Sequence, residues 1–257
     1  MKVALITGAS GGIGHAIAMS LLEKGYHVSV TGRKLHTLTS AFVSVDPAKV
    51  HCIEADATEF TSYSEVVEKT VERFGQLDLL VNSVGGGTLG QTLEKTTLES
   101  WNLAMNLNAT SVYFTSQAAL PYLVATKGTI INFSSILASR PVNGLGPYSA
   151  SKAAVEMITK SLGLELSSKG IRVVCISPAT IQTNFHTAAG MSAETAANYY
   201  SASAQTHPIG RIGVPEDISE LVCFLADSDK AGFITGSVIH VDGGRMLTSA
   251  VATNLQK

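Results

Sequence analysis

Short segments of consecutive apolar residues recur along the chain, and most of them are rich in Val and Ile. Strands that alternate apolar and polar residues have one face in water, whereas continuous apolar strands are typical of parallel sheets covered on both faces. The pattern therefore predicts buried parallel strands. The segments are "KVALIT" (2–7), "HVSVT" (27–31), "VHCIEA" (50–55), "LDLLVNS" (77–83), "GTIINFSS" (128–135), "IRVVCIS" (171–177) and "SVIHVD" (237–242).

Segments with helical periodicity lie between the first six of these strands, for example "IGHAIAMSLLEKG" and "SYSEVVEKTVERFG". Alternation of strand and helix predicts an α/β fold with a doubly wound parallel sheet, Rossmann-like. No linker or change of composition divides the chain, so we expect a single domain over residues 1–257. The segment from Asn184 to Pro208 is rich in Ala, Ser and Thr and interrupts the alternation of strands and helices. We expect it to form a lid over a site.

The charge and the cysteine content limit the kinds of partner and the cellular location that we expect for the protein. The net charge is -2 and no run of Lys or Arg occurs, which argues against nucleic acid and anionic membranes. The widely spaced Cys52, Cys175 and Cys223 form no CxxC motif, so we expect reduced thiols, no metal site and a cytoplasmic location. The chain opens on a strand pattern, and we expect neither a signal peptide nor a membrane span.

The first strand runs into a glycine-rich turn, "TGASGGIG", with glycines at positions 8, 12 and 14. In a doubly wound fold such a turn lets backbone N–H groups and a helix N-terminus approach the pyrophosphate of a dinucleotide. A Walker loop is excluded because no Lys-Ser/Thr pair follows.

A second pattern is "YSASK", in which Tyr148 and Lys152 are four residues apart and begin a helical segment just after Pro147. Residues i and i+4 lie on one face of a helix, so the phenol and the ammonium should point the same way. Taken alone, the pair is more often part of an ordinary helix surface.

Together, TGxxxGxG and YxxxK resemble the short-chain dehydrogenase/reductase family in its compact single-domain branch, and the resemblance extends over nearly the whole chain. Ser83-Val84 and Ala179 depart from the family pattern, and Ala179 would be strained if its φ had to be positive. The further matching motifs are "NSVGG" (82–86), Asn108 in "NLNATSVYF", Ser135 after "IINFS", "SPATIQT" (177–183), "RIGVPEDI", "FITGS" and "VDGG".

The resemblance implies an oxidoreductase that transfers a hydride between NADP(H) and a carbonyl or secondary alcohol, with Tyr148 as the general acid/base. Lys152 would lower the pKa of Tyr148 and bind the nicotinamide ribose, Ser135 would stabilise the substrate oxygen, and Asn108 would hold a water. The implied cofactor-binding residues are Gly8, Ser10, Gly12, Ile13, Gly14, Arg33, Lys34, Asp56, Ala57, Asn82, Gly85, Tyr148, Lys152, Pro178, Ile181 and Thr183.

The preference for NADP(H) depends on the end of the second strand, where an acidic residue would bind the ribose hydroxyls of NAD. Gly32 stands there instead, followed by Arg33 and Lys34, and a guanidinium can bind a 2′-phosphate. Asp56 would then lie beside the adenine. The alternative is that Arg33 is a solvated loop residue.

Other functions remain open. A cofactor-binding sensor that has lost its chemistry would typically lack Tyr148 or Lys152. Epimerases and dehydratases of the extended branch have longer chains, and an enoyl-thioester reductase spaces its Tyr and Lys more widely. The substrate is not identified: Arg140 is either a carboxylate contact or a surface charge, and His186 and His207 could touch substrate. Family members usually pair their helices, so we expect a homo-oligomer, a tetramer.

Overall fold

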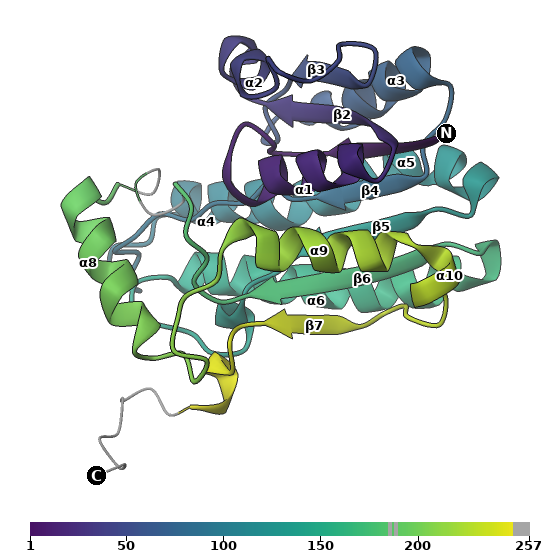
Figure 1. The fold of residues 1–257 in the computed structure, drawn as a ribbon. Helices are drawn as coiled ribbons and strands as arrows, with labels where there is room; N and C mark the ends of the chain where they lie inside the picture. Colours follow the sequence, from purple (N-terminus) through teal and green to yellow (C-terminus); the bar gives the residue numbers. More distant parts are fainter. Residues whose placement is uncertain (185–186, 188–189, 249–257) are drawn as a thin grey trace.

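The computed structural model describes residues 1–184, 187 and 190–248, which form one seven-stranded parallel sheet with helices on both faces (Figure 1). The spatial order of the strands is β3-β2-β1-β4-β5-β6-β7. All seven predicted strands and the doubly wound, Rossmann-like fold are confirmed. The strands are β1 (Lys2–Ile6), β2 (Tyr26–Gly32), β3 (Val50–Glu54), β4 (Leu79–Asn82), β5 (Thr129–Phe133), β6 (Arg172–Pro178) and β7 (Val238–Val241).

The helices form two layers. One face of the sheet is covered by α1 (Gly12–Glu23) and α9 (Pro215–Ala226), and the other by α3 (Ser62–Phe74), α5 (Ser111–Thr126) and α6 (Gly146–Leu166) (Figure 1). The other helices are α2 (Leu35–Ala41), α4 (Leu98–Met105), α8 (Ala193–Ala204) and α10 (Ser228–Ala231). No helix formed by the described residues is long and apolar enough to cross a membrane.

The two layers explain why the strands are apolar at successive positions. In β1, Ala4 and Ile6 pack in the core under α1 and α9, while Leu5 packs in the core under α3, α5 and α6. In β6, Val174 likewise packs under α1 and α9, and Val173 packs under α3, α5 and α6. All five residues are fully buried, so both faces of each strand need apolar side chains.

The strand order places the site. The chain proceeds outward from β1 through β2 to β3, and then outward on the other side from β4 to β7. At such a switch point the connections after the carboxyl ends of β1 and β4 turn to opposite faces, which leaves a crevice. The glycine turn follows β1 there, the Asn82–Gly86 segment follows β4, and Ser135 follows β5.

The segment from Asn184 to Pro208 is more regular than its sequence predicts, because it contains α8. The Ser192 side chain caps this helix by accepting a hydrogen bond from Thr195 N at 3.1 Å. Few of its residues are buried, notably Ala196 and Ser203, so the apolar periodicity is weak. The expected role as a lid stays a prediction, and His186 lies outside the described residues.

Candidate active site

The glycine turn between β1 and α1 requires its glycines. Gly8 and Gly12 adopt φ of 71° and 59°, in the left-handed region. At Gly14 a Cβ would lie 2.5 Å from the carbonyl oxygen of Gly8. No side chain caps α1 and its first turn has no acidic residue, so the N–H groups from Ile13 onward have no side-chain acceptor. This turn fits an anionic group such as a pyrophosphate.

Ser135, Tyr148 and Lys152 come together at the carboxyl end of β5. Lys152 Nζ lies 5.8 Å from the centre of the Tyr148 ring, as expected for residues one turn apart on α6. Ser135 forms a side-chain hydrogen bond with Tyr148. Tyr148 is 9% exposed and Lys152 only 3%. The site is therefore a buried phenol that is hydrogen-bonded to a hydroxyl and lies close to an amine.

Burial dominates the electrostatics of Tyr148. Loss of water raises its pKa to about 12, although the hydrogen bond from Ser135 acts in the opposite direction. The pKa of Tyr148 is thus raised, whereas a lowered pKa was expected from the neighbouring Lys152, and the lowering contribution comes from Ser135 instead. The physical reason is that desolvation disfavours the phenolate more strongly than the Ser135 hydrogen bond favours it. Tyr148 is consequently protonated at neutral pH.

Lys152 is held by the strand below it. Its Nζ donates a hydrogen bond to Phe133 O at 2.9 Å. Burial lowers its pKa to about 8. A Cβ on Gly85 would lie 2.8 Å from this Nζ and 3.0 Å from Asn108 Oδ1, so only glycine fits there. The predicted residues Gly85, Asn108 and Lys152 are thus neighbours.

Asn108 lies in a π-helical turn, η1 (Asn106–Thr110), between α4 and α5. It is fully buried, and its Oδ1 accepts a hydrogen bond from Gly86 N at 3.1 Å. Its Nδ2 donates to Gly86 O and to Ala104 O, both at 2.9 Å. Asn108 therefore fixes the loop that follows β4, and π-turns of this kind are frequent at functional sites.

Three residues of the site were not predicted. A Cβ on Gly87 would lie 2.8 Å from Tyr148 Cδ2, so the absence of a side chain leaves room for the ring. Thr7 Oγ1 accepts hydrogen bonds from Ser83 N and Val84 N, at 3.1 and 3.2 Å. Ser134 Oγ lies 3.0 Å from Lys152 O. The run of three glycines after Val84 was a usable signal for Gly87.

The loop after β6 lies against the glycine turn. Pro178 ends the strand, and Ile181 is buried and pairs with Gly213. A Cβ on Gly12 would lie 3.3 Å from the Thr183 side chain. Ala179 is not among the described non-glycine residues with positive φ, so the strain considered from the sequence does not arise.

The side chain of Asn82 forms hydrogen bonds inside the protein. Its side chain is buried, and Nδ2 donates to Asn132 Oδ1 at 2.8 Å and to Ser116 Oγ at 3.2 Å. These bonds tie β4 to β5 and α5, which leaves only the backbone of Asn82 to face a cofactor.

The end of β2 carries the exposed residues Arg33 and Lys34. A Cβ on Gly32 would lie 3.4 Å from Ser10 Cβ, so Ser10 of the glycine turn is next to this loop. Hydrogen bonds from Thr58 lower the pKa of Asp56, and the charge of Arg33 contributes to this shift. Ala57 is half-buried beside them. The structure thus brings the predicted adenosine-side residues together.

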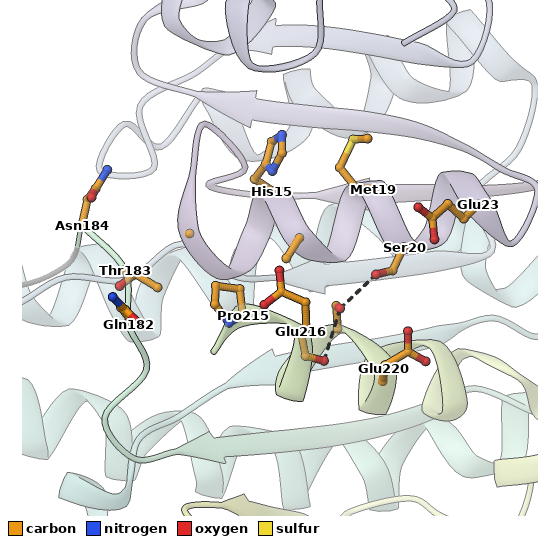
Figure 2. Close-up of a pocket in the computed structure, with 13 residues that line it drawn as sticks. His15, Met19, Ser20, Glu23, Gln182, Thr183, Asn184, Pro215, Glu216 and Glu220 are labelled. Carbon is orange, nitrogen blue, oxygen red and sulfur yellow. Dashed lines mark hydrogen bonds between the residues drawn. The ribbon is translucent and has the colours of Figure 1, made fainter. Parts of the chain in front are cut away.

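A cavity of about 550 Å³ lies between α1 and α9 (Figure 2). It borders the glycine turn at Gly12 and the β6 loop at Thr183, and Ser20 Oγ donates to Ser219 Oγ across it at 2.9 Å. Neither Ser135, Tyr148 nor Lys152 lines it. The residues that line this cavity offer no set comparable to the buried phenol, hydroxyl and amine at Tyr148.

Comparison with known proteins decides the family. The family model described as "Enoyl-(Acyl carrier protein) reductase" matches residues 8–246. The chain belongs to the short-chain dehydrogenase/reductase family. It is 33% identical over 249 residues to a 3-oxoacyl-[acyl-carrier-protein] reductase of Thermotoga maritima, covering 96% of this chain and 98% of that protein.

Solved structures agree with this assignment. A short-chain dehydrogenase/reductase of unknown function from Caenorhabditis elegans, crystallised with cofactor, superposes with a TM-score of 0.91 at 32% identity, over 97% of this chain and 96% of that one. The ligand-free aldohexose dehydrogenase of Thermoplasma acidophilum gives 0.85 at 30% identity, over 98% and 96%. The names of the Thermotoga maritima reductase and the Thermoplasma acidophilum dehydrogenase give different substrates, so similarity at this level identifies an oxidoreductase family that uses a nicotinamide cofactor and small molecules.

Proposed function

We propose that this protein is an NADP(H)-dependent oxidoreductase that interconverts a carbonyl and a secondary alcohol, with Tyr148 as the general acid/base. The observation that carries the proposal is the meeting of the half-buried Ser135 with the buried Tyr148 and Lys152 at the switch point of the sheet. The four-residue spacing of Tyr148 and Lys152 favours carbonyl over enoyl chemistry.

The residues present fit the cofactor. Gly8, Gly12 and Gly14 would hold its pyrophosphate against the uncapped start of α1, and Pro178, Ile181 and Thr183 would flank the nicotinamide. When bound, the cofactor supplies or accepts the hydride. Gly85 would let it lie close to Lys152, because a side chain there would collide with Nζ.

Residues of the chain would donate the proton that the carbonyl oxygen needs during reduction and replace it from solvent. Tyr148 is protonated at neutral pH, since burial raises its pKa to about 12, and it can therefore donate a proton to the carbonyl oxygen during reduction. The single O–H of Ser135, which is hydrogen-bonded to Tyr148 in the structure, would turn to the same substrate oxygen as negative charge develops there. Lys152 and Asn108 would return a proton from solvent.

A direct test follows the nicotinamide absorbance with NADPH and a panel of ketones, 3-oxoacyl thioesters, steroids and sugars. Tyr148→Phe should lower kcat by about 100-fold or more while the Kd for NADPH stays within about twofold. Tyr122→Phe on α5 is the matched control. Retention of more than a few per cent of kcat by Tyr148→Phe would exclude Tyr148 as the acid. Binding of NADPH without turnover of any substrate would favour the sensor.

The preference for NADP(H) has its own test. Arg33 is exposed next to Ser10, where the two could bind a 2′-phosphate together. Arg33→Ala should raise the KM for NADPH by about 10- to 100-fold and leave that for NADH nearly unchanged. Arg73→Ala, which removes an exposed arginine on α3, is the control. Equal kcat/KM for NADPH and NADH in the unmodified protein would overturn the assignment.

A further inference from the structure

A smaller cavity, of about 160 Å³, lies where the segment between α8 and α9 meets the loop after β6 and the end of β7. Ser135, Tyr148 and Lys152 do not line it, whereas Ile181, which we propose flanks the nicotinamide, does. The cavity therefore adjoins the proposed cofactor site but does not include the residues of the candidate active site.

His207 forms a buried part of the wall of this cavity. It is 4% exposed, whereas Ile209, which also lines the cavity, is 63% exposed. Nδ1 of His207 lies 2.7 Å from Ser203 O, and it must be the donor because a carbonyl oxygen only accepts. In the neutral ring Nε2 is then an acceptor, and this atom is buried without a hydrogen-bond partner. An acceptor without a donor therefore belongs to a cavity that reaches the surface.

The His207 ring turns its Nε2 edge toward the cavity. A Cβ on Gly243 would lie 3.5 Å from His207 Cδ2, the ring atom bonded to Nε2. Gly243 also lines the cavity, whereas the opposite edge of the ring, with Nδ1, faces Ser203 on α8. The hydrogen bond to Ser203 thus holds the ring in the orientation that presents Nε2 to the cavity.

The charged residues that line the cavity are Arg211, Asp217 and Asp242, so its wall has an excess of one negative charge. Arg211 donates to both carboxylate oxygens of Asp217, at 2.6 and 2.8 Å, and these two charges compensate each other. Asp242 takes part in none of the ion pairs that the described residues form, and its oxygens accept only two backbone N–H groups, at 3.0 and 2.7 Å. A half-buried carboxylate without a cation and a buried acceptor without a donor cost free energy that a cationic donor would offset.

We propose that this cavity binds the ammonium group of a small primary amine, with His207 Nε2 and the Asp242 carboxylate as its acceptors. An ammonium group has three N–H donors and a positive charge, so one group satisfies both acceptors. A volume of about 160 Å³ corresponds to about five water molecules, which limits the ligand to about five non-hydrogen atoms. This binding site goes beyond the proposed reductase activity and does not depend on it.

The test compares three small probes in calorimetric titrations of the unmodified protein at pH 7 and constant ionic strength. Ethanolamine is protonated at this pH and has both a positive charge and N–H donors. Ethylene glycol has a similar size and hydrogen-bond donors without the charge, and tetramethylammonium has the charge without a donor. We expect a Kd for ethanolamine of about 1 mM and at least about 10-fold weaker binding of the other two probes.

Two variants test the acceptors separately. His207→Asn keeps an N–H that can donate to Ser203 O in place of Nδ1, but it has no atom at the position of Nε2, so it should weaken binding of ethanolamine by about 10-fold or more. Asp242→Asn removes the charge and should bring the Kd for ethanolamine to within about threefold of that for ethylene glycol. His240→Asn, at an exposed position on β7, is the control and should leave the Kd for ethanolamine unchanged.

The probe comparison needs neither a variant nor turnover, so its outcome is independent of the reductase assignment. Absence of ethanolamine binding, or binding no tighter than that of ethylene glycol or tetramethylammonium, would overturn the proposal. An unchanged Kd for ethanolamine in His207→Asn would overturn it as well. Ammonium chloride distinguishes the free ion from an organic amine, and tighter binding of ammonium than of ethanolamine would exclude an amine as the ligand.

Discussion

At the residue scale, burial of the Lys152 ammonium lowers the stability of the folded protein. The ammonium is buried, and its pKa falls from 10.5 to about 8, which corresponds to a cost on the order of 3 kcal/mol. Its hydrogen bond to Phe133 O recovers only part of this cost. A buried charge that weakens the fold is typical of a group that serves the reaction.

This cost predicts how Lys152→Met behaves. Below pH 8 the folded protein must carry the buried charge, and above the unfolded pKa near 10.5 both states are neutral. The variant should therefore be at least as stable as the unmodified protein at pH 7, with its relative stability falling as the pH rises from 8 to 10.5. Urea unfolding at pH 7 and at about pH 10 measures this.

Lys160→Met, an exposed position on the same helix, is the control and should show little dependence on pH. Activity of Lys152→Met should be lost at every pH, because the proton return path and the ribose contact disappear together. A stability difference between Lys152→Met and the unmodified protein that does not change with pH would contradict the assigned pKa.

The proximity of Tyr148 and Lys152 was predictable from their spacing, and Ser135 and Asn108 from the family resemblance, but the electrostatics of Tyr148 were not. Tyr148 and Lys152 lie on one helix, so their common face follows from helical geometry alone. The raised pKa of Tyr148 depends instead on burial by Gly87 and its neighbours, which come from a different part of the sheet. The residue types in the sequence predict which residues form the site, whereas tertiary packing determines the pKa of each of them.

At the element scale, the strands and the long helices follow from apolar patterning, because burial on two faces leaves a continuous apolar signal. The region around Asn108 is different, since its helical residues divide into α4, η1 and α5. The π-turn inserts one extra residue, which the Asn108 side chain stabilises through Gly86, 22 residues away. A local pattern does not contain a contact of that kind. The same limit applies to α8, whose small residues give little periodicity.

The loop after β4 gives a prediction about packing between elements. In Gly87→Ala the new Cβ would lie 2.8 Å from Tyr148 Cδ2 and 3.1 Å from Cγ. These distances are too short, so the Tyr148 ring would have to shift from its position at the start of α6. A displacement of about 1 Å in the proton donor should lower kcat by about 100-fold. The Kd for the cofactor should change little.

Gly146→Ala is the matched control, because Gly146 begins the same helix and a Cβ there meets nothing within 4 Å. It should leave kcat unchanged. Steady-state kinetics and a thermal unfolding curve for both variants measure the effects on activity and on stability. Unaltered kcat in Gly87→Ala would show that this glycine does not position Tyr148.

At the scale of the whole molecule, large apolar side chains remain exposed on the helices of one layer. Trp101 and Leu103 on α4 are 40% and 49% exposed, and Met157 and Leu164 on α6 are 63% and 84% exposed. The strand β7 lies at the edge of the sheet with nothing paired on its outer side among the described residues. Exposed apolar helix faces and an open sheet edge are both surfaces that a second copy of the chain can cover.

We therefore predict a homotetramer built from two kinds of contact, one through α4, α5 and α6 and one beside β7, where Phe233 is fully exposed. Light scattering at micromolar concentration should give about four times the chain mass of 26.9 kDa. Leu164→Glu should leave dimers joined beside β7, and Phe233→Asp should leave dimers joined through the helices, because a buried unpaired carboxylate disrupts an apolar contact. Val43→Glu, at an exposed apolar position in the loop after α2, should leave the tetramer intact. A monomeric mass for the unmodified protein would exclude both contacts, and a dimer insensitive to Leu164→Glu would exclude the one through the helices.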